Sequence, residues 1–252
     1  MISFRSIRLV FALFITAFAF GSLWPSLGYA QNLRGVGVVL IHGKGGGQGP
    51  LQPLAQELRK QGAIILMPSM SWKAGYRPYE QTVQEVAAAV VRIRQMGAQK
   101  VFLAGHSMGA NISIGYVAAG GSVDGIIAMA PGHRPDFIAT MTGDSLDRAR
   151  AMVAAGRGNE RAQFLDWGGR VMPVTTTAAA YVSFFDPDGP AGQAARGRGT
   201  GRSILWVIGR ADRPAMRDRA PYASGTRIEV DGNHQQTPVA AVPHVLEWLA
   251  SR

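Results

Sequence analysis

Short apolar segments alternate along this chain with amphipathic segments of helical period, and this alternation most restricts the possible folds. Strands that are apolar on both faces and separated by helices indicate a mostly parallel sheet covered by helices on both sides. We therefore predict an α/β fold with six strands. The predicted strands cover residues 35–42, 63–67, 101–105, 125–130, 203–209 and 227–230, and the clearest helices cover residues 51–61, 79–96 and 239–250.

Composition supports a folded chain of one large domain. The 252 residues are 47% hydrophobic and 17% charged, which is the reverse of the balance in disordered proteins. The chain has no cysteine, which excludes disulfides, thiolate metal sites and a cysteine nucleophile.

The first thirty residues have the pattern of a secretory signal peptide. Arg5 and Arg8 precede an apolar run over residues 9–20, and small residues ending at Ala30 follow. The run is short for a bilayer-spanning helix, and no second hydrophobic span follows it. We predict a signal peptide over residues 1–30, cleaved near Ala30, and a mature domain over residues 31–252 in the periplasm or outside the cell. An uncleaved anchor is the alternative.

The formal net charge of +10 raises the question of an anionic partner. The basic residues are mostly scattered, and no basic stripe alternates with aromatic side chains that could stack on bases. We predict no nucleic-acid partner and interpret the excess arginine as a solvated surface.

Residues 132–200 separate the fourth and fifth predicted strands and are too many for a plain connection. We predict a lid-like helical insertion here, with one helix near residues 145–155. Aromatic side chains concentrate in the insertion, so we expect some of them to form an apolar substrate pocket. The predicted pocket residues are His106, Trp167, Tyr181 and Phe185, with Phe164 and Phe184 as further candidates. Ordinary core packing is the alternative.

The third predicted strand runs directly into Gly105-His106-Ser107-Met108-Gly109, and a helix is expected to follow. In this G-x-S-x-G pattern the serine occupies a sharp turn, and the glycines allow the neighbouring backbone to approach closely. The pattern predicts that Ser107 is a nucleophile. It also directs the backbone N–H of Met108 toward a developing oxyanion.

A serine nucleophile on such a turn needs an acid and then a histidine later in the chain. Asp212 follows the fifth predicted strand, and His234 follows the sixth. We predict that Ser107, Asp212 and His234 are the catalytic residues. Asp136 is the main alternative acid, and Asp231 is a weaker one.

The first predicted strand ends in His42-Gly43-Lys44, followed by three more glycines. A glycine-rich turn here supplies the second oxyanion donor, which we assign to the backbone N–H of Lys44. The spacing fits neither a phosphate-binding loop nor a dinucleotide fingerprint, and no histidine pair has metal-ligand spacing. We therefore predict no cofactor and no metal.

Taken together, the segments IHGKGG, AGHSMGA, IGRAD and DGNH resemble those of the α/β-hydrolase superfamily. The resemblance covers about residues 35–250 and implies a compact six-stranded version of that fold. It implies that Ser107, Asp212 and His234 are nucleophile, acid and base, and that Lys44 and Met108 form the oxyanion hole.

These features predict a serine hydrolase that cleaves a carboxylic ester of a small-molecule acyl substrate. Thioesterase, amidase or peptidase activity, and a catalytically silent binding protein, are the alternatives. The Lys44 side chain is expected either to contact an anionic group of the substrate or to extend to water. The sequence makes no prediction of oligomeric state.

Overall fold

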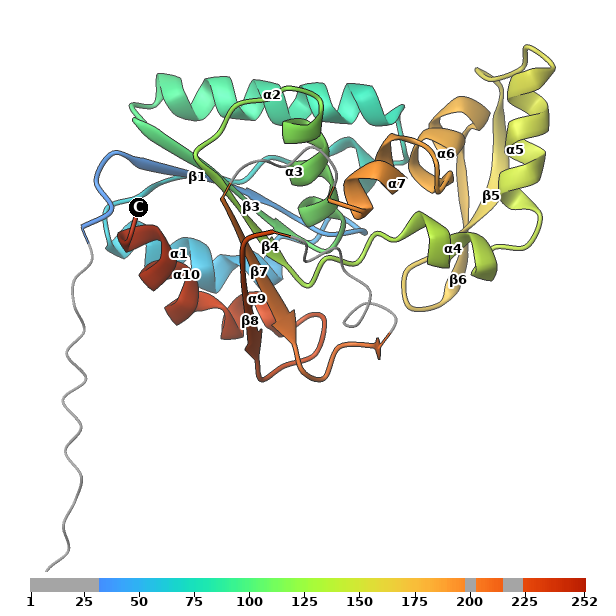
Figure 1. Cartoon of the computed structure of the whole chain (residues 1–252). Helices are drawn as coiled ribbons and strands as arrows, with labels where there is room; N and C mark the ends of the chain where they lie inside the picture. The colour runs from blue at the N-terminus through green and yellow to red at the C-terminus, as the bar shows by residue number, and fades with distance from the viewer. Residues whose placement is uncertain (1–31, 198–202, 215–223) are drawn as a thin grey trace, which may run out of the picture. The chain divides into compact units, whose positions relative to one another are not determined.

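A computed structural model describes residues 32–197, 203–214 and 224–252. A parallel sheet of six strands, in the order β2-β1-β3-β4-β7-β8, is its centre (Figure 1). The strands are β1 (Val36–Ile41), β2 (Ile64–Leu66), β3 (Lys100–His106), β4 (Gly125–Met129), β7 (Ile204–Gly209) and β8 (Thr226–Val230). The predicted α/β fold with six mostly parallel strands is therefore confirmed.

Helices cover both faces of this sheet. On one face lie α2 (Tyr79–Gln95) and α3 (Met108–Ala118), and on the other lie α1 (Gln52–Lys60) and α10 (Val242–Ala250), with the short α9 (Thr237–Ala240) before α10. Successive side chains of a strand point to opposite faces, so β1 sends Val39 and Ile41 into one core and Val38 and Leu40 into the other. This two-sided burial is why the strands are apolar without alternation.

The strand order brings the loops that follow the strands to one edge of the sheet. The first strand of the sheet in chain order is β1, and β2 pairs with one side of it. The chain then returns through α2 to β3 on the other side of β1. Ile41 and Gly105 are paired at the ends of β1 and β3, so the segments after these strands lie side by side. Ligands of open α/β sheets bind at such a reversal of strand order.

The insertion between β4 and β7 is only partly helical. It contains α4 (Pro135–Met141), α5 (Ser145–Ala154), α6 (Ala178–Phe185) and α7 (Pro190–Ala195). It also contains an antiparallel hairpin of β5 (Arg161–Trp167) and β6 (Val171–Thr177), which is separate from the main sheet. The helix near residues 145–155 is confirmed. The predicted helical insertion also contains a hairpin that the sequence did not indicate, and its role as a lid stays a prediction.

The hairpin was missed for a local reason. Pro173 lies inside β6, and proline is rare within strands because it has no N–H to donate. It is tolerated here because the hairpin has only two strands. The predicted signal peptide over residues 1–30 and the end of the insertion at residues 198–200 lie outside the described residues. Among the described residues, no helix combines the length and the apolar character needed to cross a bilayer.

Candidate active site

Ser107 lies on a sharp turn between β3 and α3. Its backbone has φ of +57° and ψ of −113°, a conformation that non-glycine residues rarely adopt. A Cβ at Gly105 would lie 2.2 Å from the backbone of Gly109, and a Cβ at Gly109 would lie 2.1 Å from the Ile41 carbonyl oxygen. Only glycines fit at these two positions, so the close packing of strand and helix holds the serine in its strained conformation.

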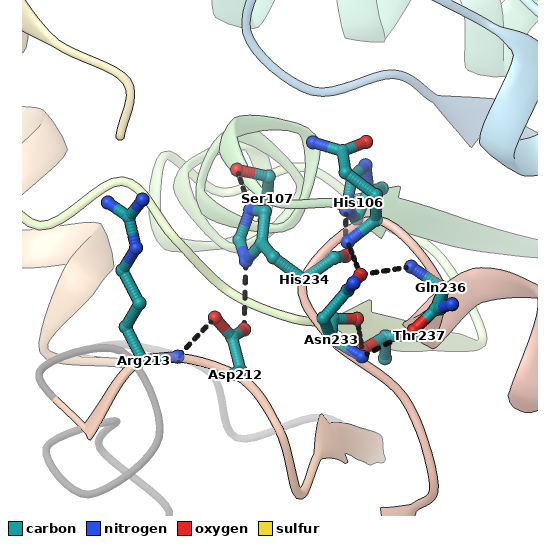
Figure 2. A network of polar contacts seen from close by, with 9 residues as sticks. His106, Ser107, Asp212, Arg213, Asn233, His234, Gln236 and Thr237 are labelled. Atoms are coloured by element: carbon teal, nitrogen blue, oxygen red, sulfur yellow. Dashed lines mark hydrogen bonds and ion pairs between the residues drawn. The ribbon is translucent and has the colours of Figure 1, made fainter. Parts of the chain in front are cut away.

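The structure brings Ser107, His234 and Asp212 together in one chain of hydrogen bonds (Figure 2). His234 Nε2 lies 2.9 Å from Ser107 Oγ, and His234 Nδ1 lies 2.8 Å from an Asp212 carboxylate oxygen. The other oxygen of Asp212 accepts a 2.7 Å bond from the Arg213 backbone N–H. Since the carboxylate can only accept, Nδ1 carries the proton and Nε2 is free to take one from Ser107.

The three side chains differ in how deeply they are buried. The Asp212 side chain is only 3% exposed, whereas that of His234 is 28% exposed and Ser107 is partly exposed. A buried carboxylate holds the imidazole in one orientation, and a partly open serine can receive a substrate. The alternative acids lie elsewhere: Asp136 pairs with Arg134, and Asp231 pairs with Arg210.

His106, the predicted pocket residue next to the serine, is 3% exposed and supports His234 instead. Its Nε2 donates a 2.9 Å hydrogen bond to the His234 carbonyl oxygen. Burial lowers the pKa of His106 to about 4, and the neighbouring His234 ring contributes to the shift. His106 is therefore neutral near pH 7 and available as a fixed donor.

Two glycines leave space around the nucleophile. A Cβ at Gly132, after β4, would lie 2.7 Å from both Ser107 Oγ and His234 Cε1. A Cβ at Gly43, after β1, would lie 3.1 Å from Ser107 Cβ. Any side chain at Gly132 would therefore obstruct the Ser107 hydroxyl and the His234 ring. In the sequence only its place after a strand could have indicated this residue.

The two predicted oxyanion donors lie beside the serine. Met108 is the first residue of α3, where a backbone N–H has no acceptor within the helix. Lys44 directly follows Gly43, whose carbonyl accepts hydrogen bonds from Trp72 Nε1 at 3.0 Å and from His42 Nδ1 at 2.8 Å. His42 thus stabilises this turn.

Comparison with known proteins agrees with this fold. Residues 33–154 match the family model described as serine aminopeptidase, S33. The fold resembles that of the Paleococcus ferrophilus monoacylglycerol lipase, with a TM-score of 0.62, 20% identity, and coverage of 85% of this chain and 94% of that one. The chain has the α/β-hydrolase fold.

Other solved structures share the fold at similarly low identity. One comes from a study of two metagenome-derived lipolytic enzymes, LipS and LipT, with a TM-score of 0.60, 14% identity, and coverage of 87% of this chain and 95% of that one. Another is the esterase domain of a Rhodothermus marinus protein, with a TM-score of 0.58, 15% identity, and coverage of 86% and 88%. No curated protein is significantly similar to this chain in sequence.

The Lys44 side chain follows neither of the two predicted paths. Its ammonium forms an ion pair with Asp166 of β5 at 2.6 Å and donates to the Trp167 carbonyl oxygen at 2.9 Å. It is thus neither free for an anionic substrate group nor extended into water. The prediction was wrong because the buried partner lies 122 residues away in the sequence.

The predicted aromatic pocket residues take two different positions. Tyr181 and Phe185 are 0% and 1% exposed and stack on each other at 4.3 Å, which places them in a packed core. Phe164 and Phe184 are equally buried. Trp167 is partly exposed, and the Arg213 guanidinium lies 5.0 Å from the centre of its ring. Trp167 therefore lies between the Lys44 turn and the Asp212 loop, and of these five aromatic residues it is the best placed to meet a substrate.

Sequence reasoning missed Asp166. Its neighbours are apolar, and it shares a strand face with the buried Phe164. An acid at an inward strand position is the signal that could have identified it, because a buried carboxylate needs partners. Across the described ranges, no group of three potential metal-ligating side chains converges.

Proposed function

We propose that this protein is a serine hydrolase that cleaves carboxylic esters through an acyl-enzyme on Ser107. The observation that carries the proposal is the hydrogen-bonded series Ser107–His234–Asp212 on a strained strand-to-helix turn. Strain at a nucleophile persists only where the surrounding packing enforces it, and here two glycines allow that packing.

In acylation, His234 Nε2 takes the hydroxyl proton as Ser107 Oγ attacks the substrate carbonyl carbon. The carbonyl π electrons move to oxygen, and the backbone N–H groups of Lys44 and Met108 bind the resulting oxyanion. Asp212 stabilises the imidazolium without taking its proton. The tetrahedral intermediate then collapses, the bond to the leaving oxygen breaks, and His234 returns the proton to the alkoxide.

Deacylation repeats these steps with water. His234 removes a proton from water as its oxygen attacks the acyl carbon, and the second tetrahedral intermediate expels Ser107 Oγ. His234 then returns the proton to the serine, and a carboxylic acid leaves. Every group in this cycle belongs to the chain or to water, so the proposal requires no cofactor.

Esters are the favoured substrate class because the structural relatives are described as lipolytic enzymes, a lipase and an esterase domain. The family model carries a different description, serine aminopeptidase, and makes peptide cleavage the second candidate. The same three side chains serve both reactions, so the substrate must be decided by measurement.

The decisive experiment combines labelling with a substrate panel. The purified protein is treated with a fluorophosphonate, and peptide mass spectrometry locates the adduct, which we expect on Ser107. Turnover is then measured with p-nitrophenyl esters of increasing acyl length, matched thioesters and aminoacyl anilides. Preferred turnover of the anilides would establish the peptidase. No adduct and no turnover would indicate a binding protein.

The location of the protein is a separate proposal that depends on the first thirty residues alone. We propose that the hydrolase is exported and that its mature form begins near Gln31. N-terminal sequencing of protein from the periplasmic and medium fractions tests this. A chain that retains Met1 in the membrane fraction would establish the anchor instead.

A further inference from the structure

The segment after β1 is rich in glycine, which makes it a flexible support for a backbone N–H that must keep one direction. Residues 43–47, named here the glycine loop, consist of Lys44 and four glycines. Gly45 and Gly46 have φ values of +84° and +73°, and a Cβ at Gly45 or Gly47 would meet no atom within 4 Å. Glycines lose the most conformational freedom on ordering, and Gly45 and Gly47 make little contact with the rest of the chain. The loop therefore needs anchors to hold an N–H group in one direction.

The first anchor acts on the backbone at Gly43. His42 Nε2 accepts a 3.0 Å bond from the Met70 N–H, so its Nδ1 carries the proton and donates to the Gly43 carbonyl. Trp72 donates to the same carbonyl. This anchor holds the start of the glycine loop against Ser107. Because the Gly43 carbonyl and the Lys44 N–H belong to one planar peptide, it also orients that N–H from the carbonyl side. The other side of the same peptide is the Lys44 Cα, which the Lys44 side chain can hold in place.

The second anchor is Lys44, which carries the only side chain of the loop. Its ammonium bonds to the Asp166 carboxylate and to the Trp167 carbonyl, and it lies 5.5 Å from the centre of the Phe185 ring. The Lys44 Cδ would lie 3.4 Å from a Cβ on Gly168, at the turn of the hairpin. The outer end of the side chain is therefore held by the insertion.

Asp166 is equipped to hold this cation. It is 4% exposed, and one carboxylate oxygen accepts from Lys44 and from the Trp167 N–H at 2.6 Å. The other oxygen accepts a 2.8 Å bond from the buried Tyr76 hydroxyl. Burial and this carboxylate raise the pKa of Tyr76 well above its ordinary value, so Tyr76 stays protonated as a donor. A carboxylate with donors on both oxygens has little freedom to move.

We infer that Asp166 is a positioning residue for acyl transfer, which holds the Lys44 side chain so that the Lys44 N–H stays directed at the developing oxyanion. The inference rests on the proposed function. It makes the insertion part of the oxyanion hole, even though no atom of Asp166 touches the reacting groups.

The first test compares Asp166→Asn, Lys44→Met and the double variant on p-nitrophenyl acetate, a small neutral ester. Removal of one oxyanion donor lowers kcat by about 10²- to 10³-fold, and a misdirected donor should cost less, about 10- to 100-fold. KM should change less than about two-fold, because the donor acts mainly in the transition state. The double variant should be no slower than the slower single variant, because the two side chains act as one unit. Lys44→Arg keeps a cation and should restore part of kcat.

The second test needs no substrate. Amide hydrogen exchange over residues 43–47 should be faster in Asp166→Asn and Lys44→Met than in the unmodified protein, because the loop loses one of its anchors. The matched control is Arg150→Met, which removes the ion pair between Arg150 of α5 and Asp186, a pair with two hydrogen bonds of 2.8 and 3.0 Å. The control should lower Tm, with kcat and loop exchange unchanged.

These measurements separate the two proposals. If the unmodified protein neither reacts with a fluorophosphonate nor hydrolyses any ester, the proposed function is wrong, whatever the exchange rates show. If it is active, and the Asp166 and Lys44 variants keep full kcat per labelled serine with only a lower Tm, Asp166 is purely structural and the inference is overturned. Should both variants fail to fold, Tyr76→Phe removes one donor from Asp166 and keeps the ion pair. A several-fold lower kcat then supports the inference, and unchanged kcat and loop exchange overturn it.

Discussion

The parallel sheet and the insertion contribute to the same site by different means. The sheet presents Ser107, Asp212 and His234 on loops after β3, β7 and β8, from strands packed on both faces. The insertion presents Asp166 from a two-stranded hairpin, and this residue reaches the site only through Lys44. In the proposed mechanism, the groups that react therefore lie on the rigid sheet, whereas the insertion acts on a backbone donor through one side chain.

The largest expected effect tests the contribution of the sheet to catalysis, and it comes from Ser107→Ala. The variant should lose nearly all turnover, about 10⁶-fold in kcat by analogy with other serine hydrolases, because no other group supplies the nucleophile. The Tm should change little, since within the described part of the chain the Ser107 hydroxyl forms a hydrogen bond only with His234. Ester turnover and thermal unfolding are the measurements. Substantial turnover by this variant would move the chemistry to another residue.

The next largest effect should separate the candidate acids. Asp212→Asn should lower kcat by about 10⁴-fold, because an amide cannot hold the His234 tautomer that accepts the serine proton. Asp136→Asn should leave kcat unchanged, because Asp136 is exposed and pairs with Arg134 at the start of α4. The reverse pattern of losses would mean that the acid has been assigned to the wrong strand.

Two aromatic substitutions can separate the insertion's contribution to stability from its contribution to substrate binding. Tyr181→Ala should destabilise the protein by about 3–5 kcal/mol, because the ring is fully buried between Phe164 and Phe185. Trp167→Ala should cost less stability but raise KM for esters of long acyl chains, because Trp167 is partly exposed beside Lys44 and Arg213. Urea unfolding and an acyl-length series measure the two effects. Unchanged KM for Trp167→Ala would leave all five of the aromatic residues predicted for the pocket as structural residues.

The smallest predicted effect is a pH dependence of stability to which both regions contribute a buried histidine, His106 from the sheet and His133 from the insertion. Burial lowers the pKa of His133 to about 3, with the Lys44 charge contributing, and burial lowers that of His106 to about 4. Both histidines lie in the folded protein as neutral rings and gain protons on unfolding below pH 6.5. Stability is therefore fully present above pH 6.5 and falls as the pH drops, by up to about 1.4 kcal/mol per pH unit for each histidine.

Urea unfolding between pH 7 and pH 4 measures this slope. His133→Gln keeps a donor for the Phe184 carbonyl, to which His133 Nε2 bonds at 2.8 Å, and it removes the titrating ring. The variant should unfold with a shallower pH dependence than the unmodified protein. An identical slope would show that His133 is not protonated on unfolding.

The sheet and the serine turn could be predicted from the sequence because their causes are local. A strand buried on both faces must be apolar throughout, as β1 and β3 are, and a strand-to-helix turn this tight requires Gly105 and Gly109. Chain order then sufficed to propose Asp212 and His234, since the loops after parallel strands meet at one edge. Here the structure brings the proposed residues within hydrogen-bond distance.

The partner of Lys44 was decided only by the tertiary structure. Neither the hairpin, with Pro173 in one strand, nor the pairing of Lys44 with Asp166 leaves a periodic signal in the sequence. The charge of Lys44 indicates that its ammonium needs an acidic partner or water, but it does not indicate which of the two the ammonium contacts. Once folding excludes water from the space between the glycine loop and β5, the low dielectric there makes the nearest carboxylate the required partner. Proximity of this kind, across 122 residues, is set by how the insertion packs on the sheet.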